Sequence, residues 1–314
     1  MDQHIDTCIG FFLTSREAAG RSPKTVQSYR WHLDVFRSWA EEEGLTDITA
    51  ITIEDLERFI VFLRSRDTLF TNHPKRREEK RPLSAATIYG TIRALKTFFK
   101  FLAQRRYLAS DPAAGLVMPK KPKKLRPTIP LKAVESMLAA AQRGPCPTRD
   151  RALMLLLLDT GPRVSELCRL DIKDLDLEEG KMTILNGKGE KDRVVCITPR
   201  VISALAELVD DRPRQEPVFA NSQTGRRLTP EGINKILYRT RDLAGLDGTR
   251  VNAHTWRHTF ASRAAGRNGN VFALQEVMGH EDIATTRLYV QPDFEEIKAW
   301  HSEASPVNDL DVDL

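Results

Sequence analysis

Residues 118–127 constrain the fold more than any other segment, because they separate a chain of 314 residues into two parts. The segment contains three prolines and five cations. Proline interrupts helices, and like charges at this density repel one another and keep the backbone extended. Each part is long enough to bury a core of its own. We therefore predict a helical domain at 1–115, a basic linker at 116–128, a second domain at 129–302 and an acidic tail at 303–314.

The part before the linker has the pattern of an all-helical domain. Ser22 is a predicted helix N-cap followed by proline, and apolar residues then recur at helical spacing from 26 to 40. Further helices are predicted at 53–64 and after Ser84. The polar stretch 66–82 is predicted to be an exposed connection.

The helix after Ser84 has an apolar face, which needs a partner, and a basic face. The basic face is a candidate for contact with phosphates, but basic residues are equally common on solvated helix surfaces. It carries Tyr89, Arg93, Lys96 and Lys100. The linker lysines allow the same two interpretations, phosphate contact or a plain solvated tether. They are Lys120, Lys121, Lys123 and Lys124.

The part after the linker is predicted to be mainly helical with one small sheet. Two β-prone runs, 181–185 and 193–198, flank a glycine-containing connection and indicate a hairpin, and strand signals occur only in this half. The predicted helices are 131–142, 149–158, one after Thr229, 255–265, 271–278 and 282–289. The fold class is therefore mainly α with a small β-sheet, an all-helical N-terminal domain followed by an α+β domain.

Arg163 is a candidate clamp for an anion. It follows the Gly161-Pro162 break and begins a helix, where backbone N–H groups also favour negative charge. Its guanidinium is planar, always charged and able to hold two oxygens at once. Glu166, one turn later, is placed to hold that guanidinium, and an ordinary surface ion pair is the alternative.

Lys188 stands between two glycines on the predicted hairpin tip. A mobile lysine there can act as a general acid toward a departing oxygen. A solubilising lysine in a turn has the same pattern.

A histidine-rich helix supplies the second arginine. His254 and Arg257 are three residues apart, so they share a helical face and can address one phosphate. His254 is a candidate proton acceptor, and His280 a candidate donor to a phosphate oxygen. Metal binding by His254 and His258 is the alternative, but no glutamate follows His254 and Arg257 would repel a cation. His258 is better explained as a packing or hydrogen-bonding residue.

Tyr289 is the candidate nucleophile. A phenol has a pKa of about 10 and needs a base and nearby cations to ionise. Core packing of an aromatic near a helix end is the alternative. In combination with the two arginines, the lysine and the histidines, Tyr289 completes what metal-free attack on a phosphodiester requires.

The ordered set Arg163, Lys188, His254-x-x-Arg257, Gly279-His280 and Tyr289 resembles the tyrosine recombinase, or phage integrase, family over nearly the whole chain. Among its members the chain is most similar to Xer-like, transposon and plasmid recombinases. The resemblance implies a SAM-like core-binding domain before the catalytic domain. It also implies that Tyr289 cuts DNA to give a 3′-phosphotyrosyl link, assisted by the other five residues. No metal or nucleotide cofactor is expected.

The resemblance further implies partners, namely double-stranded DNA with a specific core site and a tetramer, of this chain alone or with a paralogous recombinase. An apolar C-terminal segment containing Phe294, Ile297 and Trp300 would dock on a neighbouring subunit. Two departures from the family pattern are Pro162 before the first arginine and Gln291 after the nucleophile. A tyrosine-type topoisomerase and a catalytically silent DNA-binding protein remain alternatives.

The chain has no features of export or membrane insertion. Its start is acidic rather than basic, and its longest apolar run, 152–158, is too short to cross a bilayer. Four cysteines lie far apart without paired spacing, which indicates reduced thiols. We expect a cytoplasmic, nucleoid-associated protein, and the net charge of +5 suits a nucleic-acid partner.

Overall fold

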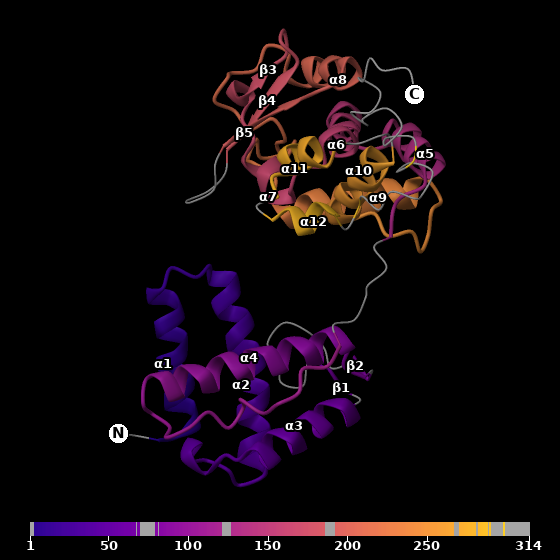
Figure 1. Ribbon diagram of the computed structural model, residues 1–314. Helices are drawn as coiled ribbons and strands as arrows, with labels where there is room; N and C mark the ends of the chain where they lie inside the picture. Colours follow the sequence, from indigo (N-terminus) through magenta and orange to yellow (C-terminus); the bar gives the residue numbers. More distant parts are fainter. Residues whose placement is uncertain are drawn as a thin grey trace, which may run out of the picture. The chain divides into compact units, whose positions relative to one another are not determined.

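The computed structural model divides into two compact units, Met1–Lys124 and Leu125–Leu314 (Figure 1). The division falls inside the segment predicted to be the linker. The residues that the structure describes are 3–66, 68–69, 79–80, 82–120, 127–185, 192–266, 270–280, 282–287, 289 and 298.

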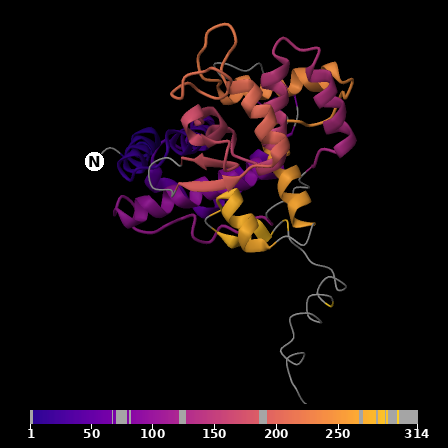
Figure 2. The same ribbon diagram turned by 90° about the horizontal axis from the view of Figure 1, so that it is seen from above.

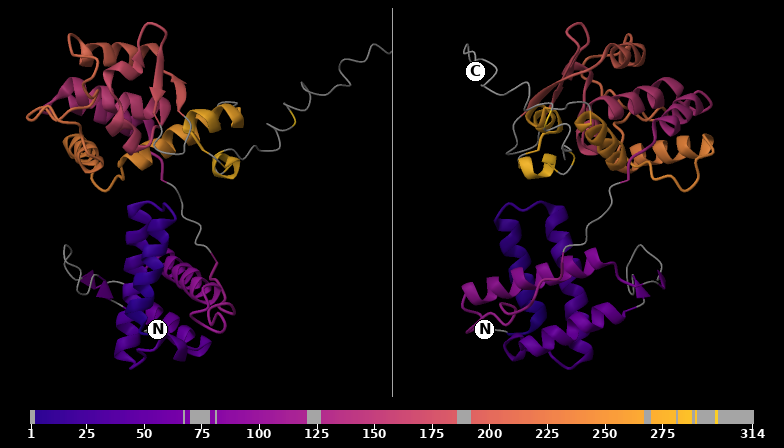
Figure 3. Two further views of the ribbon diagram at one scale, coloured as in Figure 1. Left: turned by 90° about the vertical axis from the view of Figure 1, so that its left-hand side faces the viewer. Right: turned by 45° about the vertical axis from the view of Figure 1, so that its right-hand side comes forward.

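The first unit is built from four α-helices and one 3-10 turn. They are α1 (Ile5–Ala18), α2 (Pro23–Glu42), η1 (Ile48–Ala50), α3 (Ile53–Ser65) and α4 (Ala85–Gln104). The predicted N-caps are confirmed, because the Ser22 and Ser84 hydroxyls accept from the backbone N–H groups of Thr25 and Thr87. Helix α4 crosses and contacts the α1–α2 pair (Figure 3).

Aromatic side chains fill the core of this first unit. Phe12, Phe36, Phe59, Phe98 and Phe99 are fully buried, and several meet edge to face at centroid distances between 5.2 and 5.9 Å. Edge-to-face contacts add to the free energy gained from burial alone. These buried rings therefore stabilise the first unit.

The stretch 66–82 differs from its prediction as a connection without strands. It contains two short antiparallel strands, β1 (Thr68–Leu69) and β2 (Glu79–Lys80), which pair Thr68 with Lys80. The prediction that strands occur only in the second half is wrong. Two-residue strands leave no periodicity for a sequence pattern to reveal.

The second unit combines eight α-helices with a small sheet among its described residues. The helices are α5 (Leu131–Ala141), α6 (Pro147–Thr160), α7 (Val164–Arg169), α8 (Pro199–Val209), α9 (Pro230–Leu243), α10 (Ala253–Ala265), α11 (Val271–Met278) and α12 (Ile283–Arg287), with a 3-10 turn η2 (Ile172–Asp174). Residues 152–157 of α6 are buried, and the helix packs against α8 and α10, so it forms the centre of the core. Helix α8 was not predicted.

The three-stranded sheet of the second unit is antiparallel in the order β3-β4-β5. Its strands are β3 (Leu175–Asp176), β4 (Lys181–Ile184) and β5 (Arg193–Cys196), and the predicted hairpin between β4 and β5 is confirmed. Helix α11 contacts β5 and lies beside the sheet, in yellow in Figure 2. This contact brings the end of α11 to the inward-facing side chains of β5.

Among the described residues, no helix is both long and apolar enough to cross a membrane.

Candidate active site

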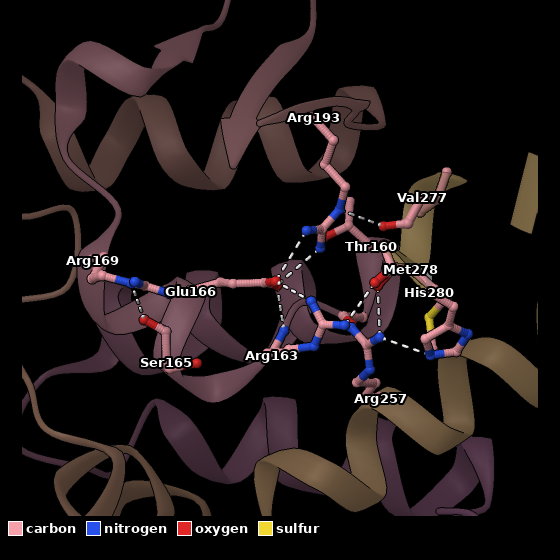
Figure 4. A network of polar contacts seen from close by, with 12 residues as sticks. Thr160, Arg163, Ser165, Glu166, Arg169, Arg193, Arg257, Val277, Met278 and His280 are labelled. Carbon is pink, nitrogen blue, oxygen red and sulfur yellow. Dashed lines mark hydrogen bonds and ion pairs between the residues drawn. The ribbon is translucent and has the colours of Figure 1, made fainter. Parts of the chain in front are cut away.

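Three guanidinium groups converge between the start of α7, strand β5, helix α10 and the turn after α11 (Figure 4). They belong to Arg163, Arg193 and Arg257, and one carboxylate, from Glu166, lies among them. The sequence motifs predicted Arg163, Arg257 and Glu166 as site residues. The structure brings them together across segments almost 100 residues apart in the chain.

Arg163 precedes α7 in an extended conformation and is held on two sides. Its Nη1 donates to Glu166 Oε1 at 2.9 Å, and its Nη2 donates to the Gly279 carbonyl at 2.6 Å. Glu166 Oε2 also accepts from the Arg163 backbone N–H at 2.7 Å. The Arg163 side chain remains 35% exposed, so an anion from solvent can reach it.

Arg257 is buried on α10 and fixed by backbone carbonyls. It donates to the carbonyls of Gly161 and Met278, both at 2.7 Å, and its Nη2 lies 3.0 Å from His280 Nε2. Burial, followed by the positive charge of Arg163, lowers the pKa of Arg257 to about 10. The group therefore stays protonated at neutral pH.

Two glycines place backbone carbonyls where Arg163 and Arg257 can donate to them. Gly161 and Gly279 have φ of +54° and +61°, the left-handed region that glycine adopts without strain. A Cβ on Gly161 would lie 2.5 Å from Phe260, and one on Gly279 would lie 2.7 Å from Arg193 Nη1. Each turn presents its carbonyl to a guanidinium, and Pro162 is buried directly after the first of them.

Tyr289 lies against the histidines of α10. Its hydroxyl is hydrogen-bonded to Nδ1 of the buried His258, and His258 Nε2 lies 2.7 Å from Nε2 of the exposed His254. The Tyr289 ring also stacks on the His280 ring, with centroids 6.5 Å apart. His280 Nδ1 is hydrogen-bonded to Thr286 at 2.9 Å. Tyr289 therefore shares a site with Arg257, which contacts the same His280.

The placement of His258 refines the sequence prediction. The sequence predicts that His254 accepts the proton of the nucleophile and that His258 has a packing or hydrogen-bonding role. In the structure His258 contacts the Tyr289 hydroxyl, and His254 contacts His258. Spacing alone cannot reveal this order, because the turn that carries Tyr289 is placed by tertiary contacts.

Arg193 is a site residue that the sequence analysis did not identify. It is 6% exposed, and its Nη1 and Nη2 donate to the two oxygens of Glu166 at 3.0 and 2.9 Å. Its Nε donates to the Val277 carbonyl at 3.0 Å. Strand alternation was the available signal, since Arg193 shares the inward face of β5 with Val195.

Glu166 stays ionised in spite of its burial. Burial raises its pKa, but hydrogen bonds and charge from Arg193, together with the backbone and side chain of Arg163, outweigh it, so that the net pKa is lowered. Glu166 is 5% exposed. A buried carboxylate in this state needs both arginines.

Some predicted residues lie outside the described part of the chain. They are the general-acid candidate Lys188, the linker residues Lys121, Lys123 and Lys124, and Gln291, Phe294, Ile297 and Trp300. Strands β4 and β5 flank the segment that contains Lys188, with Ile184 paired to Arg193 at its base. Lys120 is exposed.

The predicted basic face of α4 is only partly available for ligands. Arg93 and Lys100 are exposed, and Tyr89 is half-buried. Lys96 differs, because its Nζ donates to the carbonyls of Ala113, Ala114 and Leu116 at 2.8, 3.0 and 2.8 Å. An ammonium has three N–H donors, so Lys96 serves to fix the segment after α4.

The metal-site alternative concerns His254 and His258. Among the described residues, no group of three or more His, Cys, Asp or Glu residues could hold a metal ion. His254 and His258 are instead hydrogen-bonded to each other.

Comparison with known proteins identifies the class. Residues 128–296 match the model of the phage integrase family, and residues 10–106 match its N-terminal SAM-like domain. The chain therefore belongs to the phage integrase family. It is a site-specific tyrosine recombinase, an enzyme that breaks and rejoins DNA.

Within this family the chain is Xer-like. It is 31% identical over 300 residues to tyrosine recombinase XerC of Xylella fastidiosa (strain M23), covering 94% of this chain and 95% of the relative. It is 28% identical over 288 residues to XerC of Escherichia coli O157:H7, covering 91% of each. The integrase of transposon Tn1549, solved with circular intermediate DNA, shares the fold with a TM-score of 0.74 at 19% identity, covering 96% of this chain and all of that one.

Proposed function

We propose that Tyr289 attacks one strand of a specific core site in DNA, forming a 3′-phosphotyrosyl bond and releasing a 5′-hydroxyl. One observation carries this proposal, the hydrogen bond of the Tyr289 hydroxyl to His258 in the site that holds Arg257. The phenol requires a base and neighbouring cations to ionise near neutral pH. His258 and the guanidinium groups are the groups of the site that meet this requirement.

Arg163 and Arg257 bind the scissile phosphate in this proposal. Attack builds negative charge on the non-bridging oxygens of a five-coordinate phosphorus, and fixed donors aimed there lower the barrier most. The carbonyl contacts of both arginines fix their guanidinium groups before DNA binds. His280 Nε2 faces Arg257 and its Nδ1 is hydrogen-bonded to Thr286. When the phosphate replaces Nε2 as the acceptor of Arg257, the protonated His280 ring donates to a phosphate oxygen.

Protons move in opposite directions on the two sides of the phosphorus. His258 accepts the phenolic proton, and the exposed His254 passes it toward solvent. Lys188, on the hairpin between β4 and β5, protonates the departing 5′ oxygen. Neither step consumes a nucleotide, because one phosphodiester is exchanged for a phosphoester of similar energy, and the reverse attack rejoins the strand.

Complete recombination requires an assembly. Two duplex sites exchange four strands, each of which needs one nucleophile, so we propose a tetramer of this chain, alone or with a paralogous recombinase. Arg93, Lys100 and Tyr89 on α4 and the linker lysines supply phosphate contacts along the duplex. The working location is the cytoplasm, where the nucleoid lies.

The test of this proposal uses nicked duplexes that carry the core site, which selection from random DNA identifies. When the strand fragment beyond the nick dissociates, rejoining is blocked and the protein–DNA adduct accumulates. We expect an adduct resistant to denaturation from the unmodified protein and none from Tyr289→Phe. The matched control is Tyr238→Phe on α9, whose ring packs beneath Arg241, and it should form the adduct normally. An adduct from Tyr289→Phe would place the nucleophile elsewhere.

A further inference from the structure

Arg193 is buried on β5, and its guanidinium group is fixed by acceptors on two other elements, α7 and α11. All three of its side-chain nitrogens donate, two to Glu166 and one to the Val277 carbonyl. Figure 4 shows Arg193 and Arg163 reaching the same carboxylate. The two differ in accessibility, since the Arg193 side chain is 4% exposed and that of Arg163 is 35% exposed.

One negative charge therefore lies between two positive ones. Arg193 meets both oxygens of Glu166 in a two-pronged contact, whereas the Arg163 side chain meets Oε1 alone. Ion pairing is strong in a site with little water, and a carboxylate paired with Arg163 alone would neutralise it. The three arginines and Glu166 together carry a net charge of +2. Without Arg193 the net charge of the remaining three groups would be +1.

We propose that Arg193 is a positioning residue for strand cleavage, which compensates the charge of Glu166 and thereby keeps the Arg163 guanidinium attractive to the scissile phosphate. This inference rests on the proposed function of Arg163 as a phosphate clamp. Both terminal nitrogens of Arg193 donate to Glu166 and its Nε donates to the Val277 carbonyl, so its guanidinium group is directed toward protein acceptors. It acts through the carboxylate.

The same side chain supports the turn that carries His280. Arg193 donates to Val277 in the last turn of α11, and the Gly279 turn packs directly on its guanidinium. Gly279 in turn presents its carbonyl to Arg163. Arg193 therefore fixes the carboxylate and the carbonyl between which Arg163 is held.

The experiment measures the single-turnover rate of adduct formation on the nicked duplex for Arg193→Met, Glu166→Gln and the double variant. Arg193→Met should slow cleavage at least about ten-fold, because it weakens the electrostatic stabilisation of the phosphorane. The same change made together with Glu166→Gln should slow cleavage less than about three-fold relative to Glu166→Gln alone, since no carboxylate remains to neutralise Arg163. Equal slowing with and without Glu166 would overturn the proposal.

A matched control separates this role from general support of the fold. Arg149, on α6, is also buried and donates through two nitrogens to the fully buried Asp150, at 3.0 and 2.8 Å, away from the site. Arg149→Met should lose stability yet cleave at the normal rate below its unfolding temperature. Slowing as large as that of Arg193→Met, at equal folded fraction, would mean that loss of packing explains both.

If Arg193→Met does not fold, a second variant of Arg193 replaces it. Arg193→Gln removes the positive charge but keeps a hydrogen-bond donor, and it is then measured in both Glu166 backgrounds by the same criterion. The wild-type protein distinguishes the two hypotheses. If it forms no Tyr289-dependent adduct, the proposed function fails, and if it does while Arg193 acts equally in both backgrounds, only the positioning role fails.

Discussion

Residues of one type play different parts in this site because their surroundings differ. Arg163 is accessible, whereas Arg193 and Arg257 are each 6% exposed. Buried guanidinium groups must find fixed acceptors, and the carbonyls of Gly161 and of the end of α11 supply them. The Gly279 carbonyl holds the accessible Arg163. The two left-handed glycines are thus as necessary to the site as the charged side chains.

Gly279→Ala is expected to disturb both the fold and cleavage. The left-handed backbone alone costs about 1–2 kcal/mol for a residue with a Cβ, and the added methyl would lie 2.7 Å from Arg193. Gly225→Ala is the control, because Gly225 has φ of +65° but no heavy atom within 4 Å of its Cβ position. Denaturant unfolding should show a loss in both variants, larger for Gly279→Ala, and adduct formation should slow only there. Normal cleavage by a folded Gly279→Ala would contradict this.

His32 should make the first unit sensitive to acid. Burial, followed by the charge of Arg93, lowers the pKa of His32 from 6.5 to about 4, and its Nδ1 is hydrogen-bonded to Thr91 at 2.8 Å. The unfolded chain therefore binds this proton first, so stability is complete above about pH 6.5 and falls as the pH drops toward 4. The free energy of unfolding of His32→Gln should depend less on pH in that window. Parallel curves for the two proteins would show that His32 is not responsible.

At the scale of elements, α4 shows how one helix serves two purposes. Its apolar face packs into the first core, and Arg93 and Lys100 remain exposed. Lys96 has neither role, because its ammonium group donates to backbone carbonyls of the segment that follows α4. A helical pattern identifies the face of a lysine but not the direction its long side chain takes.

Two lysines of α4 should therefore respond differently to the same substitution. Lys96→Met removes three hydrogen bonds to backbone carbonyls, and we expect a loss of about 1–3 kcal/mol in the free energy of unfolding. Lys100→Met should leave stability nearly unchanged, weaken DNA binding and reduce its salt dependence by about one counterion. Thermal unfolding and binding titrations at several salt concentrations measure both. A destabilised Lys100→Met with normal affinity would contradict the assignment.

At the scale of the whole molecule, the chain consists of two units with separate cores and a basic segment between them. The first core is rich in aromatic residues, and the second is built around α6 and the small sheet. Each unit can fold around its own core.

The linker lysines should contribute to DNA affinity through counterion release. Replacing Lys120, Lys121, Lys123 and Lys124 together by glutamine should reduce the slope of log affinity against log salt by up to about 4. The stability of neither unit should change, because Lys120 is exposed and none of the four lysines is among the described residues of either core. Binding isotherms over a range of salt concentrations provide the measurement. An unchanged slope would assign the linker to a purely mechanical role.

The amino-acid sequence by itself determined the class of this protein, because the determining signals are local. N-caps at Ser22 and Ser84, the hairpin of β4 and β5, and the apolar run of α6 depend on neighbours in the chain. The motifs around Arg163, Arg257 and Tyr289 likewise depend on spacing, and they indicate a tyrosine recombinase.

Only the tertiary structure decided which groups touch. The Arg193–Glu166 pair, the His258–Tyr289 hydrogen bond and the inward turn of Lys96 join residues far apart in the chain or outside a common pattern. Such contacts arise when buried polar groups must find partners, and the available partners depend on how the elements pack. For that reason the sequence could name Tyr289 as a candidate nucleophile, but it could not identify Arg193 as the second cation bound to Glu166.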